Sequence, residues 1–343
     1  MSYSIFCVGH PLIDMQVREA EDLLTKYKLK ANDAILADVE REPIYEELAR
    51  ERQVVFVAGG AAQNTARGAA YILPPNSVVF AGCVGDDDLA EQLRDANRRE
   101  GVLDVYQVKQ GQKTGACAVL ISSGHNRSLV TTRRVSNDLD EEHFWSPTVA
   151  PLINSAKVIY MEGYMLTHRA DISIRLAKRV SSAGKISVLN LSAPYIPRLY
   201  NAQIQEIAPY CDIIVSNEAE AEAWAVSNGH PEPTNMSVVA KAIALLPKAN
   251  TIPPRIVVVT QGALSTTVVS ADDFAPKIYP VQPLREEEIV DTNAAGDAFA
   301  GGFLAAYVLE KNLDICIETG HRLAAMCIGQ EGPRYKWPKV QVL

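Results

Sequence analysis

The alternation of short apolar, β-branched runs with helical segments limits the folds open to this chain more than any other feature. Apolar runs that predict strands occupy residues 4–8, 78–82, 158–162, 186–190, 213–216 and 256–260. Helical patterns follow at residues 61–73, 89–99, 170–183, 218–226 and 238–246. Such alternation predicts an α/β fold, in which a mostly parallel sheet is flanked by helices on both faces to give three layers.

Two regions break this alternation and predict a smaller, β-rich part. Residues 15–57 combine a long polar helical piece with short extended segments. Two short strands at 115–121 and 128–131 enclose a loop and indicate a hairpin. We expect residues 15–60 and 113–132 to pair as a small lid domain. The large α/β nucleotide-binding domain then comprises residues 1–14, 61–112 and 133–343. The alternative is that both regions are long connections.

Composition and charge narrow the classes of function and location. The 343 residues are 48% hydrophobic, which is enough for a sizeable core, and carry a formal net charge of −8. This acidic balance argues against nucleic acid or an anionic membrane as the main partner. The first residues show no secretory signal and no apolar stretch is long enough to span a bilayer, so we expect a cytoplasmic protein, with the nucleus as a further compartment. The six scattered cysteines predict reduced, buried thiols.

The strongest local signal is the small-residue turn VDTNAAGDAFAGGF at residues 290–303, which opens a helix after a strand-like end. Successive N–H groups at a helix start are unpaired, and the helix dipole adds positive charge, so this turn suits a transferred phosphate. Asp297 lies inside the turn and is either a catalytic base or a structural aspartate at the N-cap or in the first turn of the helix. Gly301 and Gly302 indicate close packing of this helix against the sheet. No G-x-x-x-x-G-K-[S/T] sequence is present, which excludes a P-loop enzyme.

A second constellation lies near the N-terminus. Asp14 follows the first strand, where it can hold neighbouring ribose hydroxyls or simply form a turn. The pair Gly59-Gly60 opens a helix and lets the backbone approach a ligand closely. Asn64 lies on the first turn of that helix and faces the same way as the turn amides. Each signal is weak alone and gains weight from the others.

Three further positions each have two interpretations. Asn217 and Glu220 share one helix face, where they can hold the water shell of Mg²⁺ or form a capping box. The turn at 260–262 can meet ATP or only reverse the chain. Arg127, at the tip of the expected hairpin, can clamp a phosphate as a lid closes or remain a solvated loop charge.

Together these motifs resemble the adenosine kinases, within the ribokinase-like carbohydrate kinases, over nearly the whole chain. The matching runs are GHPLID at 9–14, AGGAAQN at 58–64, TGAC at 114–117, NRSL at 126–129, NLSAP at 190–194, NEAEA at 217–221, TQG at 260–262 and the turn at 291–303. The turn alone points only to the superfamily, whereas NRSL and NLSAP are much more specific.

The resemblance implies ATP-dependent phosphorylation of the adenosine 5′-hydroxyl to AMP in purine salvage, with ADP as the second product and Mg²⁺ as the cofactor. Asp297 matches the catalytic base, the amides of Ala294, Ala295 and Gly296 match the anion hole, and Arg127 matches a lid arginine. The positions expected to bind substrate are His10, Leu12, Asp14, Leu36, Gly59, Gly60, Asn64, Cys117, Leu129, Met165 and Tyr195. The positions expected to bind ATP are Asn190, Asn217, Thr260, Gly262 and Asn293, and Asn217 and Glu220 would hold Mg²⁺ indirectly, through water.

Two residues depart from the family's usual pattern. Ala294 replaces the first glycine of Gly-Ala-Gly-Asp: it distorts the hole if that position needs a left-handed angle and costs little if the position is helical. His10 stands in place of an asparagine. A kinase for another nucleoside or sugar, and a catalytically impaired nucleoside-binding protein, are therefore the alternative functions. The resemblance also implies a monomer.

Overall fold

The structure is a computed structural model that describes residues 4–31, 34–122 and 126–343. Its largest sheet has nine strands in the order β16-β15-β14-β13-β12-β11-β1-β5-β7. The seven strands from β14 to β7 pair in parallel, and β15 and β16 add an antiparallel edge. In chain order the strands are β1 (Ile5–Val8), β5 (Val78–Ala81), β7 (Val102–Asp104), β11 (Val158–Glu162), β12 (Ile186–Asn190), β13 (Ile213–Asn217), β14 (Ile256–Thr260), β15 (Ser265–Ser270) and β16 (Lys277–Pro280).

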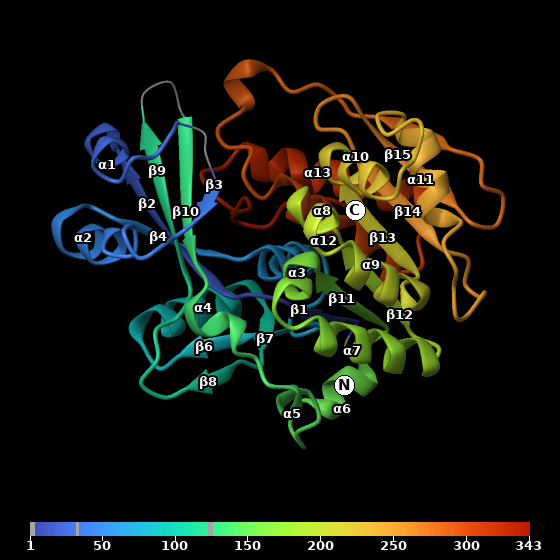
Figure 1. Cartoon of the computed structure of the whole chain (residues 1–343), viewed down its shortest axis with the longest axis horizontal. Coiled ribbons are helices and arrows are strands. Elements are labelled where there is room, and N and C mark those ends of the chain that lie inside the picture. Colours follow the sequence, from blue (N-terminus) through green and yellow to red (C-terminus); the bar gives the residue numbers. More distant parts are fainter. Residues whose placement is uncertain (1–3, 32–33, 123–125) are drawn as a thin grey trace.

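Helices cover both faces of this sheet, because successive strand residues point to opposite sides. One face buries Tyr160 and Val188 against α3 (Ala61–Ile72), α4 (Asp88–Glu100), α12 (Ala295–Val308) and α13 (Leu313–Ile328). The other buries Ile159 and Leu189 against α5 (Glu141–Phe144), α6 (Ala150–Ser155), α7 (Ala170–Ser182), α8 (Tyr195–Leu199), α9 (Asn201–Ile207), α10 (Glu218–Ser227) and α11 (Met236–Ala244). The predicted three-layer α/β fold is confirmed (Figure 1).

The glycines of α12 pack against helices rather than against the sheet, so that part of the prediction is wrong. A Cβ on Gly301 would lie 2.7 Å from the carbonyl oxygen of Thr65 in α3. A Cβ on Gly302 would lie 2.8 Å from the carbonyl oxygen of Thr319 in α13. The backbones of three helices therefore meet closely beneath the turn that opens α12.

The regions that break the alternation build a second sheet of five strands, in the order β3-β10-β9-β2-β4. These strands are β2 (Leu12–Arg18), β3 (Ala34–Leu36), β4 (Val55–Gly59), β9 (Ala116–Ser122) and β10 (Asn126–Thr132). The predicted hairpin is the antiparallel pair β9–β10, and its loop at 123–125 lies outside the described residues. Instead of one long helical piece there are two short helices, α1 (Glu21–Lys26) and α2 (Ile44–Glu51), because Pro43 begins a new helix after β3.

The chain after α13 returns across α3. The Tyr71 hydroxyl donates to the carbonyl oxygen of Lys336 at 2.7 Å and accepts from the Val340 N–H at 2.9 Å. Tyr335 packs on the same ring, with 5.2 Å between the centroids. The last residues of the chain are thereby attached to the helix that carries Asn64.

The remaining elements are short. A parallel pair joins β6 (Cys83–Gly85) to β8 (Gln107–Lys109), and 3₁₀ turns occupy Arg134–Asn137, Gly163–Thr167, Ala208–Tyr210 and Glu286–Glu288. All six cysteines are free and buried, as predicted. Among the described residues, every helix is too short or too polar to cross a bilayer.

Candidate active site

Polar residues end four neighbouring parallel strands at one edge of the main sheet. Glu162 ends β11 and stands beside Asn190 at the end of β12, while Asn217 ends β13 beside Thr260 of β14. Ligands of parallel α/β sheets bind outside the carboxyl ends of the strands. Three of the predicted ATP-binding residues therefore share the edge where a nucleotide is expected, and Glu162 joins them.

The start of α12 adds the turn that the sequence predicts to bind an anion. Ala294 caps the helix with φ 60° and ψ 11°, which is the left-handed region. Ala295, Gly296 and Asp297 form the first turn, whose N–H groups have no partners within the helix. Of the two possibilities for Ala294, the structure has the strained one, since an L-residue with a Cβ disfavours this conformation.

Asp297 is bound by an amide from the N-terminal constellation. Asn64 Nδ2 donates to Asp297 Oδ2 at 3.0 Å, so residues 233 positions apart meet. Burial raises the pKa of Asp297 from 3.8 to about 7, the Asn64 hydrogen bond opposes this rise, and the charges of Glu162, Glu220 and Asp14 add to it. Ala294 is the N-cap, so Asp297 lies in the first turn of α12, which is one of the two positions that its structural interpretation allowed. A carboxyl group with a pKa near neutrality suits a general base.

Asp14 and the glycine turn lie next to each other at the start of α3. Asp14 is 7% exposed, and a Cβ on Gly59 would lie 2.5 Å from its Oδ1, so the carboxylate packs directly on the glycine backbone. Gly60 caps α3 with φ 89°, a value that favours glycine. Burial raises the pKa of Asp14 to about 7, and the nearby guanidinium groups of Arg67 and Arg127 oppose this rise.

His10 is paired with a carboxylate that the sequence reasoning missed. Its Nδ1 lies 2.5 Å from Glu162 Oε1, and its backbone N–H donates to the same oxygen at 2.8 Å. Glu162 Oε2 accepts the N–H of Ala62 in the first turn of α3. Glu162 is 1% exposed, and its hydrogen bonds join the segment just after β1, which carries His10, to the start of α3. A carboxylate at the end of an otherwise apolar strand was the signal that could have found it.

The residues predicted to line an adenine pocket fall into two groups. Cys117 and Leu129 belong to a small apolar cluster on β9 and β10, and Leu36, on neighbouring β3, is 53% exposed. Leu12 begins β2 in the same sheet. Met165 and Tyr195 instead pack in the main body, where Met165 is fully buried.

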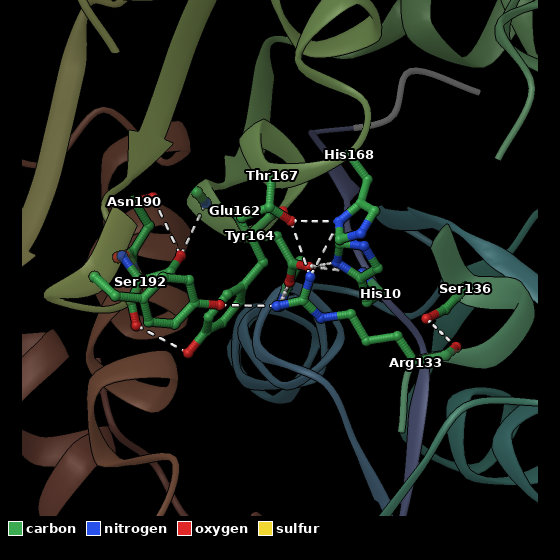
Figure 2. Close-up of polar contacts among 12 residues, drawn as sticks. His10, Arg133, Ser136, Glu162, Tyr164, Thr167, His168, Asn190 and Ser192 are labelled. Carbon is green, nitrogen blue, oxygen red and sulfur yellow. Dashed lines mark hydrogen bonds and ion pairs between the residues drawn. The ribbon is translucent and has the colours of Figure 1, made fainter. Parts of the chain in front are cut away.

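Arg133, which the sequence reasoning also missed, lies at the junction of the two parts. It follows β10 directly, and its Nη2 donates to the Tyr195 hydroxyl at 2.8 Å. Its Nη1 donates to Thr167 Oγ1 at 2.9 Å, beside His168 (Figure 2). The side chain thus joins the end of the five-stranded sheet to the main body.

Arg127 reaches from β10 to the turn before α12. Its Nη1 lies 3.0 Å from Asp291 Oδ2, and its side chain is 16% exposed, so it is not a solvated loop charge. Asp291 also accepts the N–H groups of Asn293 and Gly332, at 2.9 and 2.8 Å. The lid arginine predicted from the sequence therefore lies beside the predicted anion site.

Asn217 and Glu220 form the capping box that was one of their two interpretations. Asn217 Oδ1 accepts the Glu220 N–H at 2.9 Å, and Glu220 Oε2 accepts the Asn217 N–H at 3.0 Å. Burial raises the pKa of Glu220 to about 7, against the hydrogen bond from the Asn217 backbone. Within the described ranges no three His, Cys, Asp or Glu side chains are grouped to hold a metal ion directly.

The other predicted ATP-binding residues are held by local contacts. Asn190 Nδ2 donates to the Tyr160 hydroxyl at 2.9 Å, and its Oδ1 accepts the Ser192 N–H at 2.9 Å. The Thr260 hydroxyl lies 3.4 Å from the carbonyl oxygen of Ser216. Gly262 turns the chain with φ 56° just after β14.

Known proteins resemble this chain over its full length. Residues 22–340 match the pfkB family of carbohydrate kinases. The adenosine kinase of Schizophyllum commune is 54% identical over 343 residues, covering 100% of this chain and 99% of that protein, and the adenosine kinase of Schizosaccharomyces pombe is 39% identical, covering 99% and 98%.

Two solved structures have the same fold. Anopheles gambiae adenosine kinase in complex with P1,P4-di(adenosine-5) tetraphosphate has a TM-score of 0.89 at 36% identity and covers 96% of both chains. Schistosoma mansoni adenosine kinase in complex with adenosine and AMP has a TM-score of 0.89 at 29% identity and covers 98% of both. The chain therefore belongs to the pfkB family of carbohydrate kinases and, within it, to the adenosine kinases.

Proposed function

We propose that this protein transfers the γ-phosphate of ATP to the 5′-hydroxyl of adenosine, with AMP and ADP as products. The observation that carries this proposal is the contact between Asn64 and Asp297 at the start of α12. It brings a candidate base with a pKa near 7, a helix N-terminus suited to phosphate and a glycine turn suited to ribose into one place.

The nucleoside would bind between the two sheets. Asp14 and Asn64, beside Gly59 and Gly60, would bind the ribose, with His10 held close by Glu162. The adenine would lie among Leu12, Leu36, Cys117, Leu129, Met165 and Tyr195. Residues 15–60 and 113–132 would act as a lid domain on the rest of the chain, because closure over the substrates excludes water and limits hydrolysis of ATP.

Asp297 would accept the proton of the 5′-hydroxyl as its oxygen attacks the γ-phosphate. The amides of Ala294, Ala295 and Gly296 would stabilise the charge that develops on the phosphate oxygens. Arg127 would exchange its Asp291 partner for the phosphate, since it already lies beside this turn. Holding both substrates in line supplies a large part of the rate in such reactions.

ATP would lie along the carboxyl edge of the sheet, near Asn190, Asn217, Thr260, Gly262 and Asn293. Asn217 and Glu220 fit Mg²⁺ through water rather than directly: both side chains supply oxygens, yet these oxygens already accept hydrogen bonds within the capping box. When bound, Mg²⁺ neutralises phosphate charge. A monomeric state and a cytoplasmic location stay predictions.

Turnover of ATP to ADP, measured with and without adenosine and with AMP identified as product, tests the proposal. We expect AMP only when adenosine is present. The Asp297→Asn variant should keep its adenosine affinity and lose about 10²–10⁴-fold in kcat, the range for loss of a general base. Asp88→Asn is the matched control, because Asp88 is an exposed first-turn aspartate of α4, and it should keep full activity.

Three outcomes would contradict parts of this scheme. Near-normal turnover by Asp297→Asn would eliminate Asp297 as the base. Adenosine binding without AMP formation by the unaltered protein would favour the impaired nucleoside-binding alternative, which the strained Ala294 supports. Faster reaction of inosine, guanosine or ribose than of adenosine would reassign the substrate.

A further inference from the structure

Arg67 is a fully buried arginine that no step of the proposed reaction uses. It lies on α3, three residues after Asn64, and is 1% exposed. We propose that Arg67 is a positioning residue that holds the ribose-binding groups of this site in register. The proposal rests on the function proposed above and concerns how the same site recognises its substrate.

The guanidinium of Arg67 joins α3 to three other parts of the chain. Its Nε and Nη2 donate to the Glu100 carboxylate at the end of α4, at 2.8 and 3.0 Å. Nη2 also donates to the carbonyl oxygen of Pro333, at 2.8 Å, in the segment after α13. Nη1 donates to the carbonyl oxygen of Ala58 at 2.6 Å. Because the guanidinium is planar and rigid, these contacts fix the relative positions of the parts that they join.

Two of these contacts act directly on the ribose-binding groups. Ala58 precedes Gly59, against which the Asp14 carboxylate packs, so holding its carbonyl oxygen holds the glycine turn. Arg67 Nη1 also lies 3.4 Å from Asn64 Oδ1. An arginine only donates hydrogen bonds and a carboxylate only accepts them. The Asn64 amide must therefore turn its oxygen to Arg67 and its nitrogen to Asp297, as observed.

Charge adds to this positioning. The Arg67 guanidinium opposes the effect of burial on the Asp14 carboxyl group, whose pKa is raised to about 7, and so favours the ionised form. An ionised Asp14 is the better acceptor for ribose hydroxyls. Glu100 is 7% exposed and balances the buried positive charge with a bidentate pair.

Arg255 provides a matched comparison, because it is an equally buried arginine outside the site. It is 0% exposed and precedes β14, at the opposite edge of the sheet from the carboxyl ends. Within the part of the chain that the structure describes, its guanidinium donates to backbone carbonyl oxygens, those of Ala208, Cys211, Ile243, Leu246 and Pro247. Any effect that comes from burying an arginine should therefore appear at both positions.

The test replaces each arginine by lysine, which keeps the charge and loses the planar fork. For Arg67→Lys we expect KM and Kd for adenosine to rise about tenfold, since small displacements of positioned groups have effects of this size or larger. The KM for ATP should stay within about twofold. Because Asp14 and Asn64 would bind the ribose hydroxyls, the affinity for 2′-deoxyadenosine should fall less than the affinity for adenosine. The ratio of the two affinities, which is the preference for adenosine over 2′-deoxyadenosine, should therefore decrease. Arg255→Lys should lower stability to urea and leave that preference unchanged.

A second variant keeps the inference testable if Arg67→Lys folds poorly. Glu100→Gln removes the charge that is paired with Arg67 and keeps Arg67 itself. It should reduce the preference for adenosine over 2′-deoxyadenosine by a smaller factor than Arg67→Lys does. Equal losses of affinity for adenosine and 2′-deoxyadenosine, or an unchanged preference in both variants at this pair, would overturn the role of Arg67. Adenosine binding by calorimetry reports on this role without turnover, so failure of the unaltered protein to form AMP would count against the proposed reaction instead.

Discussion

Replacement of Ala294 by glycine tests whether the turn that opens α12 is strained. Ala294 caps α12 at φ 60° and ψ 11° and is partly buried beside Tyr71, Ala298, Leu323, Cys327, Tyr335 and Val342. An L-residue in this region loses about 1–2 kcal/mol relative to glycine. Glycine in turn makes the unfolded chain more flexible, which costs about 0.4–1 kcal/mol. Removing a half-buried methyl group costs about 0.4 kcal/mol more, half of the value for a fully buried one.

Together these contributions should change the free energy of unfolding of Ala294→Gly by between about −0.4 and +1.2 kcal/mol, where a positive change means a more stable protein. Ala295→Gly is the matched control. Ala295 is the next residue, is also partly buried and begins the helix without a positive φ. It bears the same two losses with no relief of strain and should be destabilised by about 0.8–1.4 kcal/mol. The two variants should therefore differ by about 1–2 kcal/mol, the strain itself.

Urea denaturation followed by tryptophan fluorescence measures both variants, with equal m-values required for the comparison. The difference corresponds to a few degrees in Tm. If Ala294→Gly loses as much stability as Ala295→Gly, the turn holds no strain and the reasoning fails. If the strain also distorts the anion site, Ala294→Gly should raise kcat while KM for adenosine stays constant.

Three further predictions concern carboxyl groups of the site. Asp297 must be ionised to accept a proton, and its pKa is about 7, so kcat/KM should rise as pH increases through 7. Asn64→Ala removes the hydrogen bond that opposes the raised pKa of Asp297, so it should move the midpoint of this pH profile upward. A downward move of the midpoint would contradict the assignment of Asp297 as the base. The same pKa, raised from 3.8, means that Asp297 contributes stability that is fully present below about pH 4 and lost as pH rises through 7, so Asp297→Asn should flatten this part of the stability curve. Glu162→Gln should destabilise the protein by about 1–3 kcal/mol in urea, because the amide nitrogen cannot accept the N–H groups that both carboxylate oxygens now bind, and an unchanged midpoint would argue against this role.

The strands and helices of the main body could be predicted because their apolar periodicity is a local property. The expected strands at 158–162, 186–190 and 256–260 match β11, β12 and β14 residue for residue. The helices and strands of the region before β4 were harder to predict from the sequence. Its two short helices are held by packing against the five-stranded sheet, and their sequences are too short and too polar to show separate periods.

The candidate site shows the same division between local and distant information. Small-residue turns made Asp297 and Gly60 candidates, because a backbone that closely approaches a ligand excludes large side chains. Glu162, Arg67 and Arg133 were missed, because their importance lies in partners that are far away in the chain. The contact between Arg67 and Pro333, for example, spans 266 positions, and no local pattern encodes it.

The attachment of the chain's last residues to α3 has a consequence for biosynthesis. Asp14 and Asn64 emerge from the ribosome long before Asp297, and the segment that binds Tyr71 and Arg67 is made later still. At translation rates of roughly 5–20 residues per second, the early half of the site waits on the order of tens of seconds for its partner. During that interval the face of α3 that α12 and the segment after α13 later cover is exposed to water, so its apolar surface is open to association with other chains. Activity should accordingly appear only after residues 333–340 have been made.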